Sequence, residues 1–100
     1  MTIIMVIHCF KIFEFSQVKY KRDEINMLLL GRKIRSLRKE QKISQAQLAF
    51  EAGVTRNQIV SIEKGKVNTG ISTIFYIAKA LNIHPKELFN FPLIKIDTKL

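Results

Sequence analysis

The stretch 44–66, SQAQLAFEAGVTRNQIVSIEKGK, constrains the fold of this chain more than any other part of the sequence. Ser44 and Thr55 each have a glutamine three residues later, which is the capping-box pattern typical of a helix start. Gly53 lies between the two patterns, and glycine readily adopts the positive φ that ends a helix and turns the chain. The stretch therefore predicts two short helices joined by a tight turn.

The second of these helices is predicted to have two different faces. At about 100° per residue, with Arg56 set to zero, Ile59 and Ile62 fall at about 300° and 240° and share one side. The opposite side is basic, hydrogen-bonding or small and carries no acid: Arg56, Asn57, Val60, Ser61 and Lys64. Such side chains suit guanine, adenine, phosphate and the thymine methyl group. A merely solvated face is the alternative, because every short amphipathic helix has a polar side.

The segment 30–89 resembles the helix-turn-helix region of the phage repressor and Cro family, also called XRE-type regulators. The resemblance lies in SQAQLA, in the turn AGVT and in IVSIEKGK. It implies an all-α, five-helix, repressor-like DNA-binding domain whose helix 55–64 reads the major groove by its amino-terminal half.

The resemblance also implies roles for individual residues. Arg38 and Glu63 are expected to form a bridge that locks the first helix to the reading helix, and Gln45 to bind a phosphate. The expected base contacts are Arg56 to guanine, Asn57 to adenine or a phosphate, Val60 to a thymine methyl, and Ser61. The expected DNA backbone contacts are Gln45, Gln58, Lys64, Lys66, Asn68 and Thr69. Arg56 and Val60 depart from common phage members, which often carry amides or Glu there, so the operator sequence does not follow.

Three further helices are predicted from spacing and capping residues. A helix over 28–41 buries a stripe of Leu30, Ile34 and Leu37. Ser72 is the predicted N-cap of a helix over 73–81, whose inward residues are Ile74, Ile77, Ala78 and Leu81. Pro85 opens a last short helix, and Leu88 and Phe89 are expected to close the core. Phe75, Tyr76 and Phe91 are interpreted as core or dimer-contact residues rather than as base-stacking residues.

The domain prediction is an amino-terminal extension over 1–25, a helix-turn-helix domain over 26–90 and a tail over 91–100. The segment 1–19 is apolar, but its apolar run is too short to span a bilayer. It also lacks the features of a signal peptide. Three alternatives remain for it: a β-strand that pairs with a partner chain, an added anchor for the core, or sequence upstream of a natural start at Met5 or Met27. The tail is a second candidate β-strand.

Composition limits the class of protein. A chain of 100 residues, 47% hydrophobic, supports one small core and hence one domain. A formal net charge of +9 indicates a polyanionic partner, nucleic acid before an anionic membrane, although a merely basic protein is the alternative. Cys9 is the single cysteine, His8 and His84 stand alone, and no cluster has zinc spacing, so no metal and no cofactor are predicted.

These observations predict a sequence-specific, double-stranded DNA-binding transcriptional regulator, acting in the cytoplasm as a homodimeric repressor on a near-palindromic operator. One alternative is an antitoxin-type protein that binds DNA and also a toxin partner through its amino-terminal extension. A restriction–modification controller is a variant within the regulator class. No nucleophile–base pair, carboxylate pair or phosphate-binding glycine loop is present, so an enzyme is not predicted.

Overall fold

The computed structural model of the protein describes residues 22–92, and this range is entirely helical apart from turns and loops. Its five helices are α2 (Glu24–Glu40), α3 (Gln45–Ala52), α4 (Arg56–Glu63), α5 (Ile71–Ala80) and α6 (Pro85–Leu88). The prediction of an all-α fold with five helices is therefore confirmed for the described part. The predicted strands lie outside it, except for Phe91 and Pro92, which belong to no strand.

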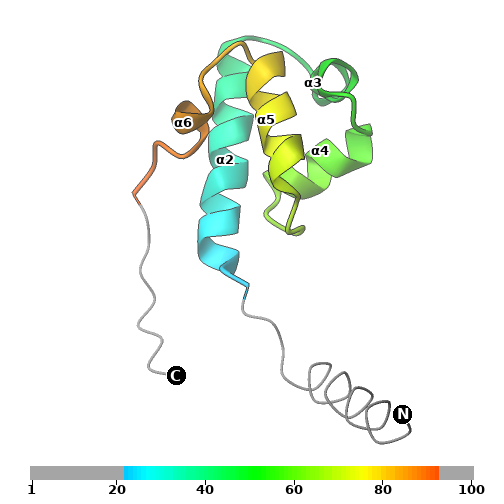
Figure 1. The fold of residues 1–100 in the computed structure, drawn as a ribbon. Coiled ribbons are helices and arrows are strands. Elements are labelled where there is room, and N and C mark those ends of the chain that lie inside the picture. Colours follow the sequence, from blue (N-terminus) through cyan, green and yellow to red (C-terminus); the bar gives the residue numbers. More distant parts are fainter. Residues whose placement is uncertain (1–21, 93–100) are drawn as a thin grey trace, which may run out of the picture.

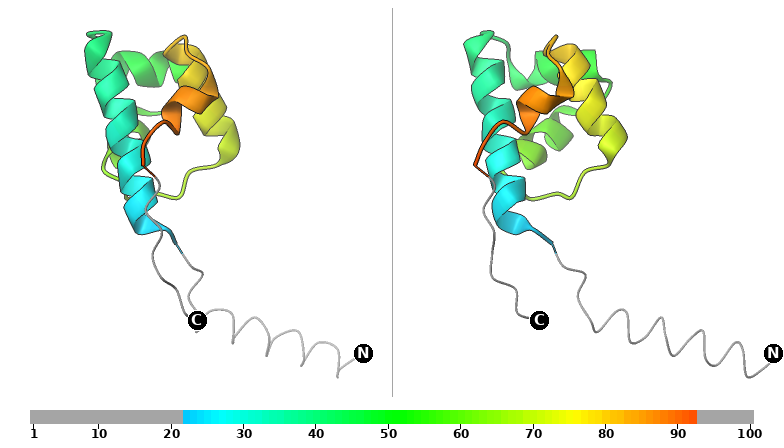
Figure 2. Two further views of the ribbon diagram at one scale, coloured as in Figure 1. Left: turned by 90° about the vertical axis from the view of Figure 1, so that its left-hand side faces the viewer. Right: turned by 60° about the vertical axis from the view of Figure 1, so that its left-hand side comes forward.

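The five helices form a closed ring around one core. Helix α2 contacts α4, α4 contacts α3, α3 contacts α5, α5 contacts α6, and α6 returns to α2. Figure 1 shows α3 and α4 on one side of α2 and α6 on the other. In both views of Figure 2 the short α6 lies between α2 and α5, and it contacts both. The ring leaves the outer side of α4 without a covering helix.

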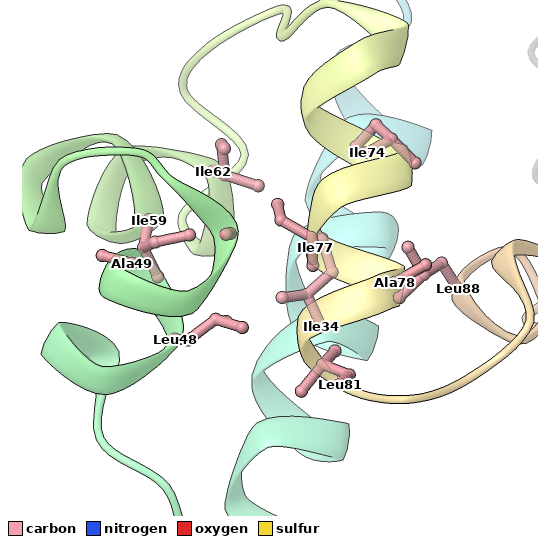
Figure 3. Packing of buried hydrophobic residues seen from close by; sticks show 11 residues of the cluster. Ile34, Leu48, Ala49, Ile59, Ile62, Ile74, Ile77, Ala78, Leu81 and Leu88 are labelled. Carbon is pink, nitrogen blue, oxygen red and sulfur yellow. The ribbon is translucent and has the colours of Figure 1, made fainter.

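The core consists of aliphatic side chains from all five helices. Figure 3 shows those of α3 and α4 facing the side chains of α2, α5 and α6. Its largest members have no exposed surface: Ile34, Leu48, Ile59, Ile77, Leu81 and Leu88. Each such side chain contributes about 1.5–3 kcal/mol when it is taken fully out of water. The four residues predicted to face inward from the helix after the loop are all buried: Ile74, Ile77, Ala78 and Leu81.

Hydrogen bonds at the helix starts explain why the chain breaks into short helices around the turn. The Thr55 hydroxyl accepts from the Gln58 amide at 3.1 Å, and the Gln58 side chain accepts from the Thr55 amide at 2.8 Å, which completes the capping box of α4. Ser44 makes half of the same pattern, accepting from the Gln47 amide at 3.0 Å. Gly53 ends α3 with a φ of +72°, as the sequence predicts.

Two helix starts differ from the prediction. Helix α2 begins at Glu24 rather than at residue 28, because Asp23 supplies an N-cap that accepts from the Asn26 amide. The predicted N-cap Ser72 is wrong: α5 begins at Ile71, and its cap is Gly70, which has no side chain to offer. The carbonyl of Gly70 already accepts from the Thr73 and Ile74 amides, so the helix starts two residues before the expected position.

The prediction for Phe89 is also wrong. Leu88 is fully buried and closes the core as expected, but 49% of the Phe89 surface is exposed. Because α6 ends at Leu88, the side chain that follows no longer points along the buried side of a helix. Phe75 and Tyr76 on α5 are likewise about half exposed, so of the two roles considered for them the core role does not apply.

Candidate nucleic-acid interface

The back of α4 packs directly against the backbone of α2. A Cβ atom added to Gly31 would overlap the carbonyl oxygen of Ile62 and would lie 2.8 Å from that of Glu63. Gly65, just after α4, has a φ of +70°, and a Cβ there would lie 2.6 Å from the Cα of Leu28. The two glycines allow α2 and the end of α4 to approach more closely than any side chain would permit.

A buried ion pair fixes the same end of α4 to α2. Arg38 Nε donates to Glu63 Oε2 at 2.7 Å, and Arg38 Nη2 donates to Glu63 Oε1 at 3.0 Å, so the pairing is bidentate. Arg38 Nη1 also donates to the Ile43 carbonyl at 2.9 Å, which ties in the loop before α3. The bridge that the resemblance implies is thus present in the structure.

Gln45 joins this network from the first residue of α3. Its Nε2 donates to Glu63 Oε1 at 3.1 Å, so one carboxylate holds together α2, α3 and α4. The sequence predicted a phosphate contact for this amide. The contact to Glu63 uses one of the two Nε2 hydrogens and leaves the other available.

The outward side of α4 presents the predicted base-reading residues. Arg56 and Asn57 are exposed at its first turn, whereas Val60 and Ser61 are half-buried further along. On the opposite side Ile59 has no exposed surface and Ile62 has 5%. The helix is therefore fixed from behind while its first turn faces solvent.

A surface hollow of about 410 Å³ lies between α4 and the loop that follows it. Five of the predicted DNA-contacting residues share its lining: Asn57, Gln58, Ser61, Asn68 and Thr69. These residues offer amide and hydroxyl groups at the wall of one depression, which is the donor and acceptor set that base edges and phosphates require. The other predicted contacts do not line it: Gln45, Arg56, Val60, Lys64 and Lys66.

Lys64 and Lys66 extend this surface toward the amino-terminal end of α2. Both are exposed, on either side of Gly65. Gln58 is exposed too; its Oε1 accepts from the Thr55 amide in the cap of α4, and its Nε2 can donate to a phosphate. Cations and amide donors thus continue beyond the hollow around the carboxyl end of α4.

Two residues near this surface were not singled out from the sequence. Gly31 lies inside the predicted helix 28–41, where glycine lowers helix stability. A glycine at such a position is a signal that another part of the backbone approaches closely. Arg22, whose Nη2 donates to the Lys66 carbonyl at 3.1 Å, has no such signal because its partner lies 44 residues away. No group of three potential metal-binding side chains occurs among residues 22–92, and no helix in this range has the length and apolar character needed to cross a membrane.

Helices α3 and α4 are short and are joined at a glycine in the left-handed conformation, and α4 exposes cationic and amide side chains to solvent. This arrangement defines a helix-turn-helix DNA-binding protein. The profile of the Helix-turn-helix family HTH_3 matches residues 34–88, and the chain belongs to this family of DNA-binding transcriptional regulators. The control protein C.BamHI of Bacillus amyloliquefaciens is 41% identical over 68 residues, which cover 67% of this chain and 84% of that protein. Two other relatives are longer, and the chain covers only 39% and 50% of their lengths.

Solved structures show the same fold. The restriction–modification controller protein C.AhdI from Aeromonas hydrophila superposes with a TM-score of 0.64 at 35% identity, covering 65% of this chain and 98% of that one. The P22 c2 repressor, solved in complex with a synthetic operator, gives a TM-score of 0.57 at 31% identity over 61% of this chain and 92% of the repressor. Each of these proteins resembles the chain over its helical domain.

Proposed function

We propose that this helix-turn-helix regulator acts as a homodimeric repressor that reads a near-palindromic operator in duplex DNA. The observation that carries the proposal is the difference in burial between the two sides of α4. Ile59 is fully buried on one side, while Arg56 and Asn57 are exposed on the other. Because both side chains at the first turn are exposed, this turn can enter the major groove.

Base reading is assigned to the outer side of α4. Arg56 has the geometry for a bidentate contact to guanine, and Asn57 for one to adenine. Val60 and Ser61, which are half-buried, supply a methyl contact and a hydroxyl. DNA backbone contacts are assigned to the surrounding cations and polar groups: Gln45, Gln58, Lys64, Lys66, Asn68 and Thr69.

A dimer is proposed because one reading helix contacts only a few base pairs, and two half-sites about 34–36 Å apart supply the remaining selectivity. An apolar hollow of about 210 Å³ beside the loop after α4 offers a surface for the second copy, and Ile71 and Phe89 line it. Ile71 is 62% exposed, and Phe75, one helical turn further along α5, is 47% exposed. The same loop borders the hollow next to the reading helix, so a second copy seated here would sit beside the same DNA.

The experiment that tests the proposal selects bound duplexes from a random DNA pool and measures affinity for the selected site against salt concentration. We expect one enriched near-palindrome and a steep loss of affinity with salt, because several cations would release condensed counterions from the DNA. No enrichment, or an affinity that is unchanged by salt, would contradict the proposal. Mass measurement in solution should show a dimer, and Phe75→Glu should shift it toward the monomer.

A restriction–modification controller is the second candidate, favoured by the similarity to C.BamHI and C.AhdI. For this role the selected site should occur upstream of a gene pair for an endonuclease and a methyltransferase. A protein partner bound through the amino-terminal extension, a cytoplasmic location and the lack of an enzymatic activity remain predictions from the sequence.

A further inference from the structure

Arg22 connects the start of α2 to the chain just after the reading helix. Its Nη2 donates to the carbonyl oxygen of Lys66 at 3.1 Å, and Arg22 itself is exposed. Arg22 is not among the residues for which a DNA contact is predicted from the sequence.

The position of Arg22 follows from backbone packing rather than from this one hydrogen bond. The first turns of α2 lie directly against Gly65, where an added Cβ would be 2.6 Å from the Cα of Leu28. This contact holds the start of α2 next to the loop that carries Lys64 and Lys66. The guanidinium is therefore placed at the backbone of the segment that carries two exposed lysines, Lys64 and Lys66, which are already assigned to the DNA backbone.

No carboxylate among the described residues neutralises Arg22. The one ion pair in this range joins Arg38 and Glu63. Asp23 is the nearest acid in sequence, but its two oxygens accept from Asn26, one from the backbone amide at 3.1 Å and one from Nδ2 at 2.8 Å. The hydrogen bond to Lys66 uses one of the five guanidinium donors, so a two-pronged set remains for a phosphate.

We propose that Arg22 is a further phosphate-binding residue, which together with Lys66 grips one strand of the DNA backbone beside the reading helix. The inference rests on the proposed DNA-binding function. The hydrogen bond to the Lys66 carbonyl limits the freedom of the Arg22 side chain before DNA arrives, so less conformational entropy is lost on binding than for an unattached arginine.

The test measures the affinity of the full chain for its selected duplex between about 50 and 200 mM salt. Over this range the release of counterions changes the affinity strongly. Arg22→Gln keeps an amide that can donate to Lys66 but removes the charge, whereas Arg22→Lys keeps the charge. Lys86→Gln on α6, which packs against α2 and α5, is the control for an equal loss of charge away from α4.

We expect Arg22→Gln to reduce the slope of log affinity against log salt by about 0.9. The affinity lost relative to wild type should therefore be about 3.5-fold smaller at 200 mM than at 50 mM salt. Arg22→Lys and Lys86→Gln should keep the wild-type slope, and every base sequence should be affected alike. Equal slopes for Arg22→Gln and wild type would overturn the proposal. So would a loss of affinity by both Arg22 variants with unchanged slopes, because the charge of Arg22 would then make no contact with a phosphate.

Thermal unfolding of each variant separates a folding defect from a binding defect. A variant that unfolds at the wild-type midpoint and loses slope supports the phosphate contact. The failure of the proposed function would look different, because wild-type protein itself would then show no selected site or no salt dependence.

Discussion

Arg38 and Glu63, 25 residues apart in sequence, form a buried bidentate ion pair whose side chains are 9% and 3% exposed. The pair joins the last part of α2 to the last residue of α4. Taking both charges out of water offsets much of their attraction, so the main effect of the pair is on orientation. Glu63 also accepts from Gln45, and α4 is thereby held at one angle relative to both neighbouring helices.

Removing one partner of this pair should be far more damaging than removing both. Arg38→Met leaves a buried, unpaired carboxylate and should lower the free energy of unfolding by about 3–5 kcal/mol. Arg38→Met combined with Glu63→Leu should recover most of that loss, because no unpaired charge remains. Urea unfolding followed by circular dichroism measures both. Equal unfolding midpoints for the single and double variants would contradict the assignment.

Gly31→Ala should destabilise the protein although alanine is the better helix former by about 1 kcal/mol. The added methyl group would overlap backbone oxygens at the end of α4, which cannot rotate away as a side chain could, and the expected net cost is about 1–3 kcal/mol. Ser36→Ala introduces the same residue at an exposed position of α2 and should be neutral or slightly stabilising. Should Gly31→Ala raise the unfolding midpoint, the close approach of α2 and α4 would be disproved.

Arg56→Ala and Lys66→Ala should have different effects on DNA binding. Loss of Arg56 should cost about 1–3 kcal/mol on the preferred site and relax the choice of base at one position. Loss of Lys66 should weaken all sequences alike and lower the salt slope by about 1. Titrations with the selected duplex and its single-base variants measure both effects. If Arg56→Ala weakened binding to all sequences equally, Arg56 would contact the DNA backbone instead of a base.

The acid stability of α2 should depend on Asp23. Its pKa is lowered because the carboxylate accepts hydrogen bonds from the side chain and the backbone amide of Asn26. A carboxyl with a lowered folded-state pKa stabilises the fold above its unfolded-state pKa, and this contribution is lost as the pH falls through the folded-state value. Asp23→Asn keeps a capping oxygen but does not titrate.

The stability of wild type relative to Asp23→Asn should therefore decline as the pH falls below about 4. Urea midpoints measured from neutral to acidic pH test this expectation. A constant difference between the two proteins over the whole range would show that the ionised carboxylate is not the stabilising group.

The helix-turn-helix could be predicted from the sequence because its signals are local. Capping residues, the turn at Gly53 and the spacing of Ile59 and Ile62 act within a few residues, and the structure confirms each of them. The face of α4 that carries Arg56 and Asn57 follows from the same helical period, so the position of the candidate site could be predicted as well.

Features that depend on distant parts of the chain could not be predicted in the same way. Ser72 is a good N-cap by type, but α5 begins one residue before it, at Ile71, with Gly70 as the N-cap and no side-chain capping bond. Phe89 is apolar yet half exposed, because its direction depends on where α6 ends. The hydrogen bond from Arg22 to Lys66 joins residues 44 positions apart and leaves no periodic trace in the sequence.

The buried residues Ile59, Ile62 and Glu63 join α4 to the rest of the domain, whereas Arg56 and Asn57 at its first turn are exposed. Substitutions at the exposed residues Arg56 and Asn57 therefore need no compensating change inside the domain. The exposed first turn of α4 can therefore change in sequence between relatives while the folded domain behind it stays the same.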